Sequence, residues 1–129
     1  MSDNPSDELA AFVGRIDRRI DAKGRLALPP ELRHRRVGIY WKIGEDFVRL
    51  APLSVWNEWH AESMLHPKTK REFSLRSAVP LIDRIHRFQI PSGIAGRFGD
   101  LDVAYIGAGD YFELWDPVDF EKAMKETAE

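Results

Sequence analysis

The chain has 129 residues, of which 43% are hydrophobic and 31% charged, a composition typical of an ordinary globular protein and not of a disordered one. It contains no cysteine, which excludes disulfides, thiolate metal sites and a cysteine nucleophile. A formal net charge of −2 argues against nonspecific binding of nucleic acid by the whole surface.

Residues 12–20 mix apolar and charged side chains and lead into a tight turn, which predicts a strand after a polar, flexible leader at 1–11. Gly24 supplies the positive φ of that turn, and 25–28 form the returning strand. Pro29 and Pro30 end this strand and begin a short helix to about residue 36. The β-rich runs 38–43 and 47–50 then form a hairpin.

The middle of the chain is predicted to be helical. Ser54 can cap a helix that ends at Pro67, and a second helical stretch follows over 68–75. We then expect a strand at 78–82, a turn at 83–87, a returning strand at 87–90, and a hairpin formed by 103–106 and 111–115. Asp116 as N-cap and Pro117 at the first helical position begin a last helix to about residue 126.

One pattern occurs at residues 20–29 and again at 82–91: an apolar residue, Asp, three variable positions, Arg, an alternation of apolar and variable residues, and Pro. Each repeat is near the size at which a separate hydrophobic core fails, so the two copies are expected to share one core. We divide the chain into a leader (1–11), repeat 1 (12–54), a helical connector (55–75), repeat 2 (76–118), and a C-terminal helix and tail (119–129).

Charge is distributed unevenly along the chain. Residues 14–36 contain eight Lys or Arg against three acids, whereas residues 98–129 contain nine acids against two lysines. The basic first repeat is therefore the expected contact surface for a polyanion. The acidic end is expected either to face away from it or to pack on the basic side of a neighbouring copy.

Arg25 and Arg87 follow the two turns, where a guanidinium can reach a phosphate or the edge of a guanine. They can equally form ion pairs with Asp21 and Asp83 that only fix the turns. Arg15, Arg18, Arg19 and Lys23 could contact phosphates on either side, or be solvated strand residues. The basic run at 33–36 is as well explained by an exposed helix end.

The sequence gives no sign of catalysis. The four histidines are not spaced with acidic residues as metal ligands are, and no nucleophile or acid pair stands out from the surface charge. We therefore predict a protein that is not an enzyme and has no metal, no cofactor and no small-molecule substrate. No apolar run could span a bilayer and the first residues lack a signal pattern, so we expect a cytoplasmic protein without a membrane partner.

The segment Asp21-Ala22-Lys23-Gly24-Arg25-Leu26-Ala27-Leu28-Pro29 resembles the SpoVT-AbrB DNA-binding motif. Its tandem arrangement, with Phe112-Glu113-Leu114-Trp115-Asp116 closing the second hairpin, is similar to the MraZ family, bacterial transcriptional regulators of the division and cell-wall gene cluster. The similarity covers residues 12 to 125. It implies a mainly β fold with short helices (α+β), in which two swapped-hairpin β units form an intramolecular pseudo-dimer barrel.

The resemblance also implies a nucleoid-associated homo-oligomer, a ring of subunits that binds short direct repeats in promoter double-stranded DNA. The expected DNA-binding residues are Arg15, Arg18, Lys23, Gly24, Arg25 and Arg87. His86 stands where the family has the glycine of the second turn, so this turn either keeps a left-handed residue or takes another shape. Two alternative functions are a protein-binding or structural module that has lost DNA binding, and an antitoxin-like autoregulator.

Overall fold

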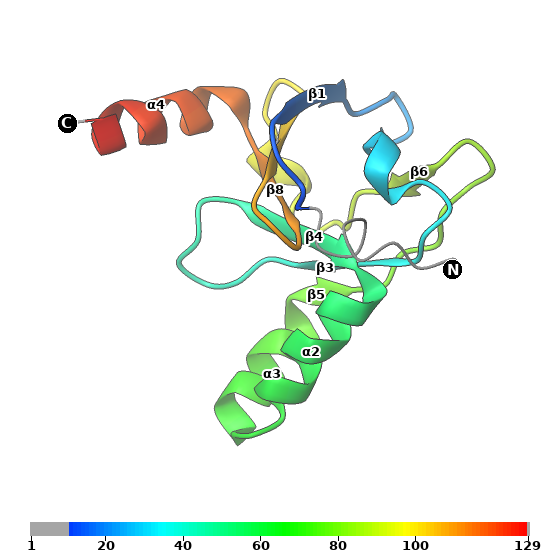
Figure 1. Ribbon diagram of the computed structural model, residues 1–129, viewed down its shortest axis with the longest axis vertical. Coiled ribbons are helices and arrows are strands. Elements are labelled where there is room, and N and C mark those ends of the chain that lie inside the picture. Colours follow the sequence, from blue (N-terminus) through cyan, green and yellow to red (C-terminus); the bar gives the residue numbers. More distant parts are fainter. Residues whose placement is uncertain (1–10, 129) are drawn as a thin grey trace, which may run out of the picture.

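The computed structural model describes residues 11–128, so nearly all of the leader expected at 1–11, and Glu129, lie outside the described residues. Eight strands form two antiparallel sheets, which confirms the mainly β fold with short helices. The larger sheet has the order β1-β7-β8-β4-β3-β5, and β2 and β6 form a separate two-stranded ribbon (Figure 1). The strands are β1 (Arg15–Arg19), β2 (Arg25–Ala27), β3 (Val37–Tyr40), β4 (Val48–Pro52), β5 (Ser77–Ala78), β6 (Arg87–Gln89), β7 (Asp102–Gly107) and β8 (Phe112–Trp115).

The two sequence repeats exchange strands. β1 of the first repeat pairs with β7 of the second, and β5 of the second repeat pairs with β3 of the first. Leu26 lies opposite Phe88 in the ribbon and Arg49 lies opposite Glu113 at the centre of the sheet, so both sheets are centred on matching residues of the two copies. The strand order of the larger sheet is also symmetric: if each strand is replaced by its counterpart in the other repeat, the same order is read in the opposite direction. The pairing agrees with the expected intertwined units, and the closed barrel stays a prediction.

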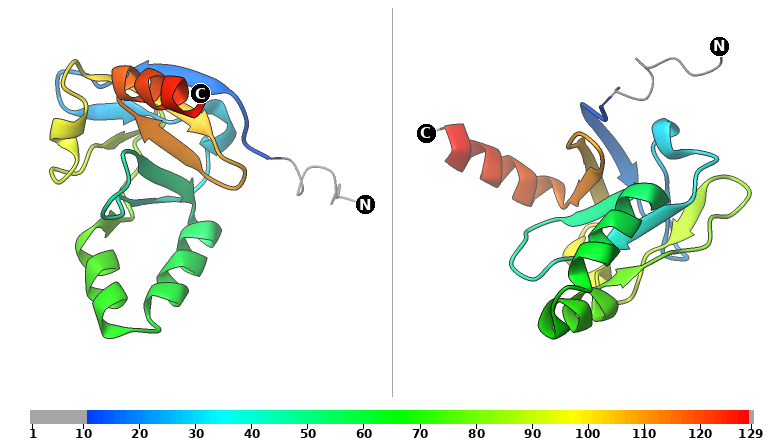
Figure 2. Two further views of the ribbon diagram at one scale, coloured as in Figure 1. Left: turned by 90° about the vertical axis from the view of Figure 1, so that its left-hand side faces the viewer. Right: turned by 60° about the horizontal axis from the view of Figure 1, so that its bottom comes forward.

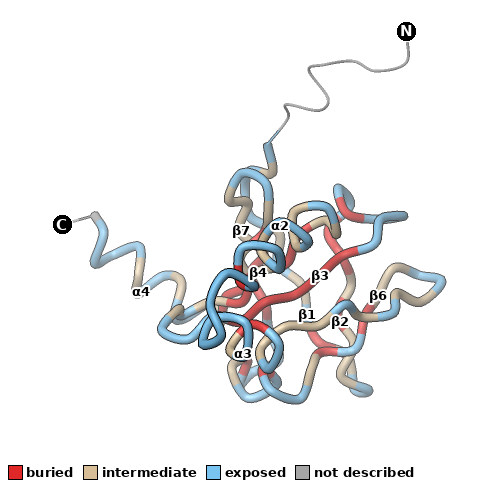
Figure 3. The backbone as a smooth tube through the Cα atoms, turned by 90° about the horizontal axis from the view of Figure 1, so that it is seen from below, coloured by how far each residue is buried: buried red, intermediate tan, exposed pale blue. Residues whose placement is uncertain are grey.

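Both repeats contribute to one hydrophobic core (Figure 3). Leu26, Leu28 and Leu50 from the first copy and Phe88 and Leu114 from the second are each at most 1% exposed. Burial alternates along β2 and β6, each of which buries its central residue, whereas β3 is buried at every position. Neither repeat could enclose these side chains alone, because the strands that cover them come from the other copy.

Three helices extend from the sheets. α2 (Leu53–Ser63) and α3 (Pro67–Leu75) form a hairpin on one side, and α4 (Pro117–Ala128) runs away from the sheet at another (Figure 2). The Asp119 amide donates to Asp116 Oδ2 at 3.4 Å, as expected of the predicted N-cap. Within residues 11–128 no helix is both long and apolar enough to cross a bilayer.

Three local predictions were wrong. The helix expected from Pro30 to residue 36 is a single 3₁₀ turn, η1 (Pro30–Leu32), because Arg33 is already extended at ψ 145°. Ser54 lies inside α2, whose N-cap is Pro52 and has no side-chain cap bond. The strand expected at 78–82 is reduced to β5, since Pro80 has no amide hydrogen to donate to the ladder.

Candidate nucleic-acid interface

The β2–β6 ribbon has one buried face and one outer face. Leu26 and Phe88 pair at its centre and are 0% and 1% exposed. Because side chains alternate along a strand, Arg25 and Ala27 of β2 lie on the outer face together with Arg87 and Gln89 of β6. The ribbon therefore places the two arginines of the repeated motif on one surface.

The first turn is organised by the carboxylate of Asp21. Its Oδ1 accepts the backbone amides of Lys23 (2.9 Å) and Arg25 (2.8 Å), and its Oδ2 accepts Arg25 Nε at 3.0 Å. The Gly24 amide donates to the Asp21 carbonyl at 2.9 Å, and Gly24 has a φ of 79°. Such an Asx-type turn needs a residue in the left-handed region, which glycine adopts most readily.

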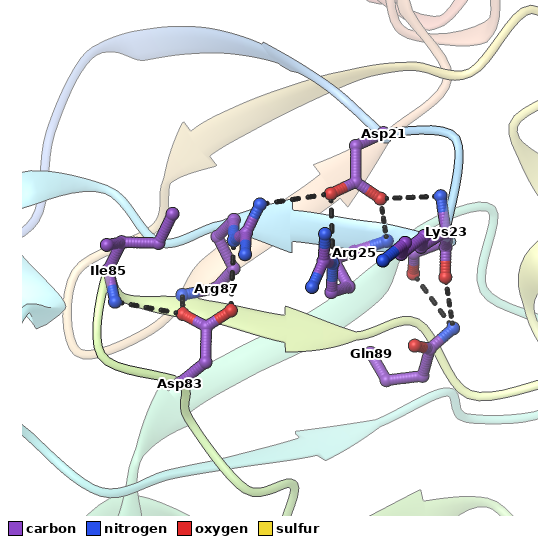
Figure 4. A network of polar contacts seen from close by, with 8 residues as sticks. Asp21, Lys23, Arg25, Asp83, Ile85, Arg87 and Gln89 are labelled. Carbon is purple, nitrogen blue, oxygen red and sulfur yellow. Dashed lines mark hydrogen bonds and ion pairs between the residues drawn. The ribbon is translucent and has the colours of Figure 1, made fainter.

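The second turn repeats this arrangement contact by contact (Figure 4). Asp83 Oδ1 accepts the amides of Ile85 (3.1 Å) and Arg87 (2.9 Å), and Oδ2 accepts Arg87 Nε at 2.9 Å. The His86 amide donates to the Asp83 carbonyl at 3.0 Å, and His86 has a φ of 63°. Of the two possibilities left open by the missing glycine, the structure has the first: His86 keeps the left-handed conformation.

Hydrogen bonding also sets the charge state of the two turns. Backbone donation from Arg25 holds the pKa of the Asp21 carboxyl below its ordinary value, and donation from Arg87 does the same for Asp83. Both carboxylates are about one-third exposed, at 31% and 34%. They are therefore ionised at neutral pH and act as fixed anchors for the arginines.

Arg25 and Arg87 are linked through Asp21. Arg87 Nη1 lies 3.3 Å from Asp21 Oδ2, the oxygen that also accepts Arg25 Nε (Figure 4). The ion pairs with the turn aspartates thus exist, as the structural interpretation of these residues requires. They leave the side chains of Arg25 and Arg87 31% and 26% exposed, and within residues 11–128 the terminal nitrogens of Arg25 make no hydrogen bond.

The two ends of the ribbon differ in the residues around the turns. Gln89 Nε2 donates to the carbonyls of Lys23 (3.1 Å) and Gly24 (3.2 Å), so it covers the first turn. A Cβ at Gly24 would lie 2.6 Å from this amide nitrogen. Ala27 occupies the position in repeat 1 that matches Gln89, which leaves room beside His86. The His86 ring instead contacts His34, with ring centroids 4.4 Å apart.

Of the predicted site residues, the structure brings together Lys23, Gly24, Arg25 and Arg87 but not Arg15 and Arg18. Arg15 Nε pairs with Asp17 Oδ1 at 2.9 Å, and its guanidinium lies 3.8 Å from Glu121 and over the ring of Phe120. Arg18 Nη1 donates to the Asp17 carbonyl at 3.0 Å. Arg15 is therefore neutralised by acids and tied to α4 rather than to the turns.

Sequence reasoning did not place several basic residues at the second turn. His34, Arg35 and Arg36 line one groove with Arg84 and His86. From the sequence alone, the basic run at 33–36 is explained equally well by an exposed helix end. Its position beside the turn depends on the β2–β6 pairing, which no local pattern reveals.

Comparison with individual known proteins identifies the family of the chain, although no family model matches it. A protein of Kineococcus radiotolerans named transcriptional regulator MraZ is 30% identical over 126 residues, covering 90% of this chain and 88% of that protein. The chain belongs to the MraZ family.

Two further relatives carry the same name. The MraZ of Leuconostoc citreum is 29% identical over 92% of this chain and 90% of its own length. The MraZ of Solidesulfovibrio magneticus is 29% identical over 91% of this chain and 87% of its own length. A similarity over more than nine-tenths of the chain includes residues of both repeats.

Proposed function

We propose that this MraZ-family chain is a transcriptional regulator that binds double-stranded DNA sequence-specifically through the outer face of the β2–β6 ribbon. The observation that carries this proposal is the pair of equivalent aspartate-ordered turns, which hold Arg25 and Arg87 diagonally across the ribbon on its outer face. The major groove of B-DNA admits a two-stranded ribbon, and arginine is the side chain that most often reads guanine there.

The turns prepare the arginines for binding. Because Asp21 and Asp83 fix Nε of each guanidinium, little side-chain entropy remains to be lost when the terminal nitrogens meet a guanine edge or a phosphate. Lys23 lies at the end of the ribbon, where its ammonium can contact a phosphate, and Gly24 gives the turn the conformation that places it there. Arg15 and Arg18 remain in the proposal only as peripheral contacts, since Arg15 is paired with acids and Arg18 donates to the Asp17 carbonyl on β1, so neither joins the turns.

Assembly would supply affinity. A ring of subunits that binds successive direct repeats in a promoter, here that of a division and cell-wall gene cluster, converts weak contacts into tight binding when the spacings match. Binding to that promoter would place the protein in the cytoplasm, at the nucleoid. The function needs no catalytic step, metal or cofactor, because the arginines and turns supply the contacts.

The experiment is a binding titration with DNA from the region upstream of the chain's own gene and with scrambled DNA, at two salt concentrations. Arg25→Ala should weaken binding to the upstream DNA about 10- to 100-fold, and wild-type affinity should fall steeply with salt. Arg71→Ala, which removes an exposed arginine of α3, is the matched control and should leave the preference intact. Equal affinity of the wild type for both DNAs would contradict the proposal for this promoter.

A protein-binding module is the second candidate function, and the compensated charge of β1 favours it. The same titration distinguishes it from the first. If the wild type also selects no sequence from a random DNA pool, DNA binding is absent and the protein-binding function is preferred.

A further inference from the structure

The two repeats form the same turn but present different surfaces around it. Asp17, Arg19 and Lys23 of the first repeat are charged and exposed. Their counterparts 62 residues later are apolar: Val79, Leu81 and Ile85, which are 38%, 92% and 61% exposed. Since the first repeat forms the same turn with charged residues, the fold does not require apolar side chains at these positions. Their exposure therefore indicates a surface that is covered by something outside the chain.

Two of these residues belong to a defined groove at the second turn, and Ile85 stands in the chain between Arg84 and His86, which also line it. Val79 and Leu81 line a groove of about 540 Å³ together with Arg35, Arg36 and Arg84. Asp83 is the one acid in its lining, so the groove is basic as well as apolar. None of the ribbon residues assigned to DNA lines it. A groove lined by exposed apolar side chains and by arginines fits an amphipathic helix with acidic residues at its edges better than a uniformly charged phosphate backbone.

The chain itself carries such a helix. α4 is anchored at its start, where the Phe120 ring lies 5.5 Å from that of Trp115, and then runs past the sheet. Phe120, Met124 and Thr127 fall on one side of the helix, and Met124 is 52% exposed. At about 100° per residue, the acids Asp119 and Glu121 lie at the two edges of this side and Lys122 lies opposite, while Glu126 and Lys125 fall in between, one on each flank.

The groove and the helix lie at opposite ends of the molecule. In Figures 1 and 3, α4 extends to the left and β6, with the turn that precedes it, lies on the right. A chain therefore cannot place its own α4 in its own groove. We infer that the groove formed by Val79, Leu81, Arg84 and their neighbours receives the α4 helix of a second copy of the chain. This contact is head-to-tail, the type of interface that builds a ring when the rotation between neighbouring copies closes.

This inference rests on the self-assembly included in the proposed function and specifies its interface. It is tested on the full chain by native mass spectrometry and sedimentation velocity. A groove variant, Leu81→Arg with Ile85→Lys, introduces the residue types of the first repeat at the matching positions. A helix variant, Met124→Lys with Thr127→Lys, changes exposed residues of α4. Leu75→Lys on α3 and Val118→Lys on another side of α4 are the matched controls, because both residues are exposed and apolar.

The wild type and both controls should form oligomers. Each double variant alone should be monomeric at the concentration where the wild type assembles, with self-association weakened at least about 30-fold, as expected when charges replace anchoring apolar residues. An equimolar mixture of the two variants should form dimers and nothing larger. In the mixture, the intact helix of the groove variant can still enter the intact groove of the helix variant, and no further contact is possible.

A monomeric wild type, groove variants that assemble like the wild type, or a mixture that remains monomeric although circular dichroism shows both variants folded would each overturn the inference. Leu81→Arg alone, at a side chain that is 92% exposed, repeats the test with the least risk to folding. A duplex with one binding site separates this result from the proposed function. The monomeric variants should retain Arg25-dependent binding to it, whereas loss of that binding without loss of assembly would assign the groove to DNA.

Discussion

The first turn has glycine at its left-handed position and the second has histidine, yet both make the same hydrogen bonds to their aspartate. Around this shared backbone the surfaces diverge. Gln89 covers the first turn, and His34 contacts the second. The aspartate and the arginine therefore define the turn, while the remaining positions are free to differ between the two ends of the ribbon.

The largest expected losses of stability come from the buried pair at the centre of the ribbon, which supports both turns. Phe88→Ala should lower the free energy of unfolding by about 3–5 kcal/mol, because it empties space at the centre of the core, and Leu26→Ala by about 2–5 kcal/mol. Urea unfolding followed by circular dichroism measures both. A loss confined to one repeat, seen as a separate transition, would contradict the shared core.

The left-handed positions should respond in opposite directions. Gly24→Ala should destabilise by about 1 kcal/mol, because alanine resists a φ of 79° and its Cβ meets Gln89. His86→Gly should stabilise the fold by about 0.5 kcal/mol. The free energy gained by removing a side chain from a left-handed position exceeds the entropy cost of ordering a glycine. Thermal unfolding of the two variants, with Gly44→Ala in an exposed loop as a comparison for Gly24→Ala, checks the signs.

Acid should weaken both turns. The pKa of Asp21 and of Asp83 is lowered by folding, so their contribution to stability is present above the unfolded value of about 3.9 and is lost as the pH falls below it. Asp21→Asn should reduce the melting temperature more than Asp83→Asn, because Asp21 also accepts from Arg87. The double variant should show a shallower decline in melting temperature between pH 5 and pH 3. An unchanged decline would show that other carboxyl groups dominate.

Much of the fold could be predicted from the sequence because short local patterns determine where its strands and helices begin and end. The repeat of Asp and Arg and the hairpins defined the strands, and Asp116 and Pro117 marked the start of α4. Ser54 misled because a capping residue type gives no information about where the preceding strand ends. β5 is shorter than its apolar sequence indicates, because Pro80 has no amide hydrogen to extend the ladder.

The candidate site was predicted less completely, since it depends on contacts between distant residues. Arg25 and Arg87 were identified from their place in the motif, but the link between them through Asp21 spans 66 residues. In the sequence, Arg15 is simply one of the basic residues of the first repeat, so it is predicted to contact DNA together with Arg25 and Arg87. Asp17 on the same strand compensates its charge, and the packing of α4 adds Glu121, which the local sequence around Arg15 does not reveal.

The most direct test of the ribbon as the DNA-contacting surface compares Arg25→Ala, Arg87→Ala and Arg15→Ala on one DNA duplex that contains a selected binding site. We predict that Arg25→Ala and Arg87→Ala each weaken binding about 10- to 100-fold, while Arg15→Ala remains close to wild type. A loss of affinity for Arg15→Ala equal to or greater than that for Arg25→Ala would contradict the account and move the DNA contact to β1.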